Sequence, residues 1–241
     1  MKIAILSDIH GNLSALENAL KKAEDYAVEA YLLLGDLIDY GMRSNETVEK
    51  IRGLSKPIIC NIYGNHESAI VNGDYSRFSS ERGKVSAKYT RSVLSEETLQ
   101  YLRDSMTCEG RYEFCLCEKK CLAVHGSLQD VYWKSVNPDG ELCDYEKYDY
   151  VFSGHSHIPH YFEKYYKSED EKKRFKKKTV FLNPGSVGQP RNHNSAAQFA
   201  ILDSETEEIH FVKVEYDIEK EQSLYNGEID DFYKNRLKEG V

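Results

Sequence analysis

The segment KIAILSDIHGN, from Lys2 to Asn12, decides how this chain is interpreted. Its apolar beginning, up to Leu6, is typical of a short buried strand. Asp8 and His10 follow the strand almost at once. Because side chains two positions apart in an extended chain lie on the same side, both can reach one common centre.

Strand and helix patterns alternate over the first seventy residues. After the first strand come an amphipathic helix, an apolar run, a second helix and a third apolar run, at residues 13–23, 31–34, 47–54 and 58–63. This alternation predicts parallel strands that are joined by right-handed crossovers. In open sheets of this kind, ligands bind beyond the carboxyl ends of the strands.

The chain becomes helical and polar between residues 73 and 106. Val85, Tyr89 and Val93 recur at helical spacing and predict the buried face of one helix there. We interpret this segment as an inserted helical pair that overhangs a site.

Short strand patterns dominate residues 112–203, and a helical tail is expected at residues 217–241. This order of elements predicts an α/β fold in which two sheets pack face to face with helices outside. We expect a single domain over residues 1–241.

Residue types that bind metals stand at the ends of five predicted strands. They are Asp8 with His10, Asp36, Asn65 with His66, His125, and His155 with His157. One buried Asp or His is often only a hydrogen-bonded core residue, but five such strand ends favour a shared site. Oxygen and imidazole ligands without a thiolate suit Mn, Fe or Zn.

These residues fall into blocks that resemble the calcineurin-like metallophosphoesterases. The blocks are Asp8-x-His10-Gly11-Asn12, Gly35-Asp36-x-x-Asp39, Gly64-Asn65-His66-Glu67, His125-Gly126 and Gly154-His155-Ser156-His157, in the order of that family. The stretch NPGSVGQPR, from Asn183 to Arg191, is further similar to the prokaryotic phosphodiesterase branch. The resemblance implies a four-layer αββα sandwich of two mixed sheets flanked by helices.

The resemblance also implies two divalent metal ions and their ligands. One ion would be bound by Asp8, His10, Asp36 and His157, and the other by Asp36, Asn65, His125 and His155. Mn or Fe is expected, with Zn as an alternative. The implied reaction is hydrolysis of a phosphodiester or nucleotide phosphoanhydride bond, by in-line attack of a hydroxide that bridges the metals.

Five further residues have roles that the resemblance suggests or leaves open. His66 is expected to protonate the leaving group as the general acid. Glu67 is expected to orient the His66 ring, although many relatives carry Asp there. Arg191 either binds a phosphate or stabilises its own loop. Asn12 either contacts the substrate or caps the first helix. Asp39 stands where this branch often has Gly, and no role is assigned to it.

The resemblance implies a small phosphorylated, nucleotide-like substrate, and a cytoplasmic location is expected. The net charge of −8 disfavours a phosphate-backbone binder, so nucleic acid is not expected as a partner. No apolar run is long enough to span a bilayer. Six cysteines without a secretory signal are expected to be reduced thiols. The basic segment Lys164–Lys178 is interpreted as an exposed hairpin tip, with an anionic partner as the alternative.

Two classes of function are compatible with these motifs. The first is a metal-dependent phosphoesterase with a nucleotide-like substrate. The second is an inactive scaffold of the same fold that binds another protein. All seven ligand positions and His66 are occupied by competent side chains, which favours the enzyme.

Overall fold

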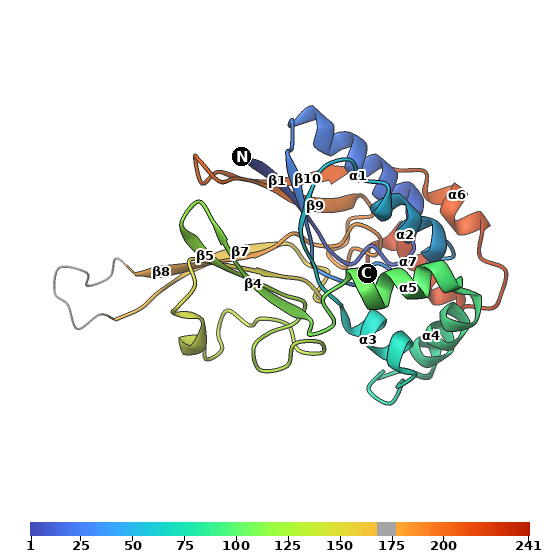
Figure 1. Ribbon diagram of the computed structural model, residues 1–241. Coiled ribbons are helices and arrows are strands. Elements are labelled where there is room, and N and C mark those ends of the chain that lie inside the picture. Colours follow the sequence, from blue (N-terminus) through green and yellow to red (C-terminus); the bar gives the residue numbers. More distant parts are fainter. Residues whose placement is uncertain (168–176) are drawn as a thin grey trace.

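The computed structural model describes residues 1–167 and 177–241, and its strands form two five-stranded sheets (Figure 1). The first sheet has the order β10-β9-β1-β2-β3 and consists of β1 (Lys2–Leu6), β2 (Ala30–Leu33), β3 (Ile58–Asn61), β9 (Ala197–Asp203) and β10 (Ile209–Val214). The second has the order β4-β5-β6-β8-β7 and consists of β4 (Arg111–Leu116), β5 (Lys119–Val124), β6 (Tyr150–Ser153), β7 (His160–Tyr165) and β8 (Lys178–Asn183).

Both sheets are mixed, with parallel strands at or near the centre. In the first sheet β1, β2 and β3 are parallel, and β9 and β10 add antiparallel pairings at one side. In the second sheet β5, β6 and β8 are parallel, and β4 and β7 are antiparallel edge strands. The loops that leave the parallel strands therefore carry the residues predicted to bind metals.

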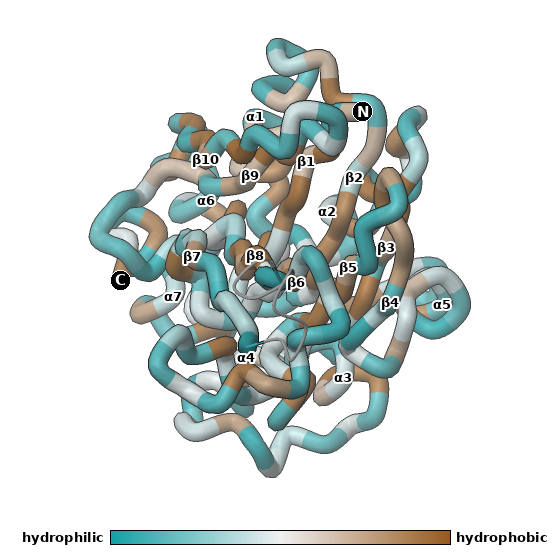
Figure 2. Tube along the Cα trace, turned by 90° about the vertical axis from the view of Figure 1, so that its left-hand side faces the viewer, coloured by the Kyte–Doolittle hydropathy of each residue, from teal (hydrophilic) through white to brown (hydrophobic). Residues whose placement is uncertain are grey.

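One hydrophobic core lies between the two sheets. Ile5 and Leu32 of the first sheet are fully buried in one cluster with Ala123, Phe152 and Leu182 of the second. Alternate residues of β1 and β2 point to the opposite face, as expected for strands that are covered on both sides. Figure 2 shows the resulting hydrophobic strands inside a more hydrophilic outer layer.

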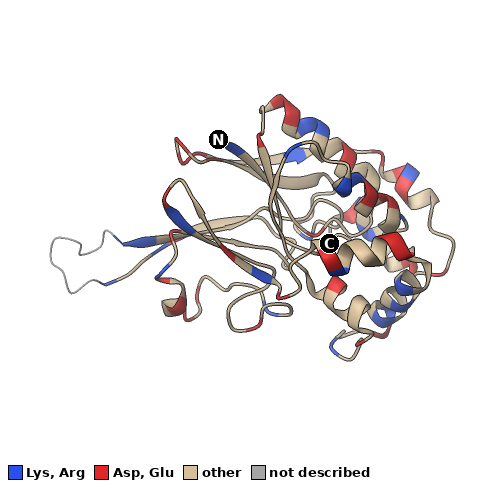
Figure 3. Ribbon diagram, in the orientation of Figure 1, with Lys and Arg blue, Asp and Glu red and all other residues tan. Residues whose placement is uncertain are grey.

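Seven α-helices complete the described part of the chain. They are α1 (Leu13–Asp25), α2 (Ser44–Arg52), α3 (Asn65–Asn72), α4 (Glu81–Val93), α5 (Glu96–Ser105), α6 (Ile218–Ser223) and α7 (Asp231–Glu239). Helices α1 and α2 contribute apolar side chains to the core on the outer face of the first sheet. Charged residues are dense on the outer helices, and β4 and β5 of the second sheet also carry several (Figure 3).

The outer face of the second sheet has a different cover. Val124 and Phe181 pack there against Val136, Leu142 and Tyr145. These last three residues belong to a connection that has little regular structure apart from a 3₁₀ turn at Cys143–Tyr145. The predicted α/β sandwich of two mixed sheets flanked by helices is confirmed, and this loop with its 3₁₀ turn covers the outer face of the second sheet.

The predicted buried face of α4 is wrong. Val85 and Val93 are each 44% exposed, whereas Ser86 and Thr90 are buried. The hydroxyl groups of Ser86 and Thr90 donate hydrogen bonds to the buried carboxylate of Asp39. A polar tertiary contact therefore decides which face of this helix is covered.

Two other expectations concern the periphery. Most of the basic segment, residues 168–176, lies outside the described residues, and the flanking strands β7 and β8 pair as an antiparallel hairpin. None of the described helices is long and apolar enough to cross a membrane.

The division of the chain into one domain with a helical insertion stays a prediction.

Candidate metal centre

All seven predicted ligands come together where the parallel strands end. Asp8 and His10 follow β1, Asp36 follows β2, Asn65 opens α3 just after β3, His125 follows β5, and His155 and His157 follow β6. Both sheets thus contribute, and the convergence depends on their face-to-face packing. His155 is partly buried and the other six are buried.

The first cluster contains Asp8, His10, Asp36 and His157, whose ligand atoms all lie within 4.8 Å of one another. The Nε2 atom of His157 lies 3.2 Å from Asp8 Oδ1. The Nε2 atom of His10 lies 3.7 Å from Asp36 Oδ2 and 3.2 Å from His157 Nε2. Two carboxylates and two imidazoles therefore face one small volume.

The second cluster shares Asp36 with the first. Ligand atoms of Asp36, His125 and His155 lie within 4.8 Å of one another. His125 Nε2 is 3.3 Å from Asp36 Oδ2. The side-chain oxygen of Asn65 completes this group, at 3.0 Å from His125 Nε2 and 2.9 Å from His155 Nδ1. Asp36 is therefore placed to bridge two ions.

Backbone carbonyls fix the orientation of three of the imidazole rings. The Nδ1 atoms of His10, His125 and His157 face the carbonyl oxygens of Ile38, Leu34 and Gln189 at 3.3, 2.7 and 2.6 Å, respectively. Because a carbonyl only accepts, each Nδ1 carries the proton and donates it. In the neutral ring, the lone pair on Nε2 then points into the cluster, as in metal-binding histidines.

The donor set fits metal ions on electrostatic grounds. Two Nε2 lone pairs, of His10 and His157, face each other at 3.2 Å. Asp8 Oδ1 and Asp36 Oδ2 are buried and have no hydrogen-bond partner in the part of the chain that the structure describes. Buried acceptors without partners are costly and rare. Cations between these atoms would satisfy all of them at once.

Burial and mutual charge set the protonation of the cluster. Burial raises the pKa of Asp8 to about 6 and lowers that of His155 to about 3. Burial also holds the pKa of His10 and His157 well below the ordinary value. Three rings are thus neutral near pH 7 and keep a lone pair for a ligand bond. Burial opposes the charge of Asp36, but His125 and His66 hold its pKa well below the usual range.

Five of the seven predicted ligands have a backbone conformation that is rare for residues other than glycine. Their φ angles are 53° for Asp8, 50° for His10, 53° for Asp36, 65° for His155 and 58° for His157. Such conformations cost about 1–3 kcal/mol each and gather at functional sites, where surrounding structure enforces them. The fold therefore holds these side chains at an energetic cost.

The comparison with known families agrees with this geometry. Residues 1–207 match the model of the calcineurin-like phosphoesterase superfamily domain. The chain belongs to this family. Members of the family bind divalent metals, and the clusters around Asp36 are the candidate site for them.

Three relatives extend the comparison. The chain is 32% identical to the uncharacterized protein MJ0912 of Methanocaldococcus jannaschii, over 98% of this chain and 94% of that one. It is similar to the crystal structure of a metallophosphoesterase from Sphaerobacter thermophilus, with 27% identity, a TM-score of 0.74 and coverage of 100% and 99%. The fold also matches an archaeal phosphodiesterase, with 20% identity, a TM-score of 0.51 and coverage of 89% and 100%.

His66 lies beside the metal clusters, and its ring is oriented by Asp39. His66 Nδ1 is 2.6 Å from Asp39 Oδ2, and both side chains are buried. Asp39 Oδ1 accepts hydrogen bonds from Ser86 at 2.6 Å and Thr90 at 2.8 Å. Sequence reasoning missed this role, although the carboxylate stands only three residues after Asp36 in the same quoted block.

The expectation that Glu67 orients His66 is wrong. The Glu67 carboxylate instead accepts hydrogen bonds from the backbone N–H groups of Asp36 and Gly64, each at 2.8 Å, and of Leu37, at 2.7 Å. It thereby ties the loop after β2 to the beginning of α3. A Cβ atom at Gly64 would lie 2.0 Å from Asp36 Oδ1, so this close approach requires glycine.

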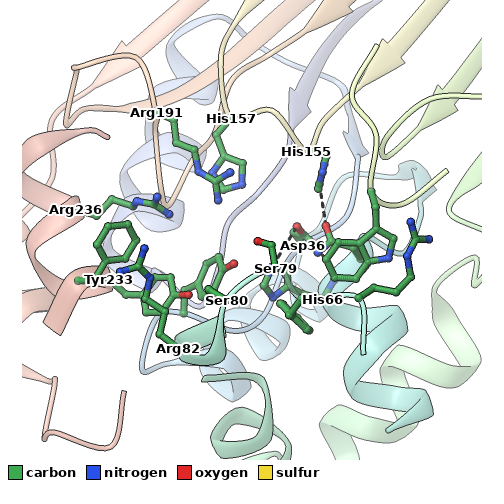
Figure 4. A pocket seen from close by; sticks show the side chains of 16 residues that line it. Asp36, His66, Ser79, Ser80, Arg82, His155, His157, Arg191, Tyr233 and Arg236 are labelled. Carbon is green, nitrogen blue, oxygen red and sulfur yellow. Dashed lines mark hydrogen bonds and ion pairs between the residues drawn. The ribbon is translucent and has the colours of Figure 1, made fainter. Parts of the chain in front are cut away.

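A cavity of about 420 Å³ opens beside the clusters (Figure 4). Asp36, His66 and His155 line one side, and Arg191 lies beside the metal-cluster residue His157 on the other. Among the described residues, no hydrogen bond joins the Arg191 side chain to its loop, which favours the phosphate-binding alternative for this residue. The cavity is large enough for a small nucleotide-like ligand.

The structure supports the capping alternative for Asn12. Its side-chain oxygen accepts from the backbone N–H of Ala15 at 3.1 Å, which caps α1. Its amide nitrogen donates to the carbonyl of Gly188 and to the hydroxyl of Tyr216, both at 3.0 Å. Both polar groups of this buried side chain are therefore engaged within the protein.

Proposed function

We propose that this protein is a dinuclear-metal-dependent phosphoesterase that hydrolyses phosphodiester or nucleotide phosphoanhydride bonds. The observation that carries the proposal is the pair of ligand clusters joined by Asp36. Asp8 Oδ1 and Asp36 Oδ2 have no hydrogen-bond partner among the described residues, and the Nε2 atoms of His10 and His157 face each other. Membership of the phosphoesterase family and similarity to a metallophosphoesterase structure support the same function.

The ligand roles follow from the two clusters. Asp8, His10, Asp36 and His157 would hold one ion, and Asp36, Asn65, His125 and His155 the other. When bound, the ions would activate a water molecule and offset negative charge at phosphorus. We propose Mn or Fe as the native metal, with Zn as the alternative, because the donors are oxygen and imidazole.

His66 is assigned as the general acid. It lines the cavity, and its Nε2 atom lies 4.0 Å from Asp36 Oδ2. Burial opposes its charge, but Asp36 and the hydrogen bond to Asp39 raise its pKa above the ordinary value. With Nδ1 directed at Asp39, the proton on Nε2 faces the cavity and is available to the departing oxygen.

The proposed substrate is a small phosphorylated compound that resembles a nucleotide. Arg191 offers a guanidinium group to a phosphate on one side of the cavity. Tyr40, Phe78 and Trp133 also line the cavity and provide apolar surface. A cytoplasmic location is part of the proposal, since a small phosphorylated metabolite would be found there.

The first test is hydrolysis of bis-p-nitrophenyl phosphate. Protein that has been freed of metal and then loaded with Mn, Fe, Co, Ni or Zn should release p-nitrophenol, and chelation should stop the reaction. No turnover with any of these metals would overturn the proposed function.

The second test concerns His66. His66→Ala should lower kcat about a hundredfold for an alkyl phosphodiester, and much less for a nitrophenyl ester, whose leaving group needs no proton. His210→Ala is the matched control, since His210 is exposed on the edge strand β10. Equal losses for both esters would remove the general-acid assignment.

A further inference from the structure

Three arginines gather on the side of the cavity that lies away from Asp36 and His155, and one of them, Arg191, lies beside His157 of the first cluster (Figure 4). Arg82 comes from α4, Arg191 from the segment between β8 and β9, and Arg236 from α7. All three line the same cavity as the metal clusters. Three segments that are far apart in the sequence therefore each contribute one arginine to this part of the cavity.

No carboxylate among the described residues pairs with any of these three arginines. Arg77, which also lines the cavity, provides the contrast, because its guanidinium pairs with Asp130 at 2.5 Å. The Nε atoms of Arg191 and Arg236 are buried and have no hydrogen-bond partner within residues 1–167 and 177–241. The positive charge on this side is thus uncompensated, and anion binding would supply what is missing.

The Phe232 ring orients two of the three guanidinium groups, those of Arg82 and Arg236. The Arg82 guanidinium carbon lies 3.8 Å from the centroid of the Phe232 ring, and that of Arg236 lies 4.4 Å from the same centroid. Such stacking keeps a guanidinium planar and oriented while its N–H groups stay available. Burial and the nearby charge of Arg191 lower the pKa of Arg236 to about 10, so it stays charged at neutral pH.

We propose that the arginine cluster, Arg82, Arg191 and Arg236, is a subsite for a second phosphate group of the substrate, one that is not cleaved. The inference rests on the proposed function, which puts the reacting phosphorus beside the metal clusters. The subsite lies in the same cavity and offers guanidinium forks that match phosphate oxygens. Preferred substrates would therefore carry at least two phosphate groups.

The C-terminal helix adds one arginine to this subsite, whereas Arg82 and Arg191 belong, like the metal ligands, to the residues 1–207 that the family model matches. Arg236 and Phe232 lie on α7, whereas the family model matches residues 1–207 only. Tyr233 of α7 also packs against Tyr40, with ring centroids 4.1 Å apart. Helix α7 is thereby attached to the loop that follows Asp36 and Asp39, and it adds a specificity element to the shared catalytic core.

The first experiment compares two substrates with the same reacting group. These are the p-nitrophenyl ester of thymidine 5′-phosphate and the same ester with an additional 3′-phosphate. In the wild type, kcat/KM should be about tenfold or more higher for the second compound, because charged hydrogen bonds are strong. Arg236→Gln should remove this preference and change hydrolysis of the first compound by less than about threefold.

Arg52→Gln is the matched control, since it removes an arginine that is exposed on α2 and lies outside the cavity lining. It should leave the preference as in the wild type. An unchanged preference in Arg236→Gln, or no preference in the wild type, would overturn the proposal. Equal losses for both substrates would do so too, because the arginines would then hold the reacting phosphate.

The second experiment needs no catalysis. Inorganic pyrophosphate is titrated by calorimetry into protein from which metals have been removed on a chelating resin. The wild type and Arg52→Gln should bind it, and Arg236→Gln should bind it at least about tenfold more weakly. Equal binding by all three would overturn the subsite even if the enzyme is active. Loss of binding in Arg236→Gln would support the subsite even if no metal restores hydrolysis, which would reject only the proposed function.

Discussion

Two carboxylates on one loop differ sharply in their surroundings. Asp36 Oδ2 is buried and has no hydrogen-bond partner among the residues that the structure describes. Asp39 is equally buried, yet both of its oxygens accept hydrogen bonds, from Ser86, Thr90 and His66. The comparison teaches that an unpaired buried acceptor marks a place for a cation, whereas a fully paired one positions its neighbours.

The largest effect is expected for Asp36→Asn, which tests whether the unpaired carboxylate binds metal. Because Asp36 belongs to both clusters, its replacement should remove bound metal and lower phosphodiesterase activity about a thousandfold or more. Metal analysis after gel filtration and kcat with bis-p-nitrophenyl phosphate measure the two effects. Circular dichroism of the variant serves as the control for folding, and a fully loaded, fully active variant would contradict the role of Asp36.

Asp39→Asn tests the paired carboxylate. Bound metal should stay near the wild-type level, because Asp39 belongs to neither cluster. Hydrolysis of esters with poor leaving groups should fall about a hundredfold, since the charge that holds the His66 proton is lost. Nitrophenyl esters should be affected much less, and loss of metal instead of acid catalysis would show that the two carboxylates do not have separate roles.

The smallest effect is expected for Thr90→Val, which tests one hydrogen bond to the paired carboxylate of Asp39. It removes one hydrogen bond to the Asp39 carboxylate and leaves a side chain of similar volume. The free energy of unfolding in urea should fall by about 1.5–3 kcal/mol, because hydrogen bonds to charged groups are stronger than neutral ones. Ser92→Ala on the exposed side of α4 should change it by less than about 0.5 kcal/mol. Similar values for both variants would argue against a structural role for this contact.

The ligand residues were predictable because their signals are local. Asp8 and His10 stand directly after a short apolar strand, and the structure places both in the first cluster. His125 and His155 likewise follow strands, and they lie in the second cluster with Asp36. A residue at the carboxyl end of a parallel strand lies at the same sheet edge as the ends of the neighbouring parallel strands.

Other features were not predictable, because their partners are distant in the sequence. The polar face of α4 is buried only because Asp39 lies across from Ser86 and Thr90, about fifty residues earlier in the chain. Glu67 was assigned to His66 because the two are adjacent, yet its carboxylate binds the backbone of the loop at Asp36. Adjacency in sequence says little about which way a side chain on a helix points.

By itself, the sequence determined the alternation of strands and helices over residues 2–63 and the residue types at the strand ends, because hydrophobic periodicity and chain direction act over a few residues. Only the tertiary structure decided which acceptors remain unpaired and that Arg236 of α7 lies in one cavity with Asp36. The physical reason is that burial and charge compensation depend on every element that packs around an atom, wherever it stands in the chain.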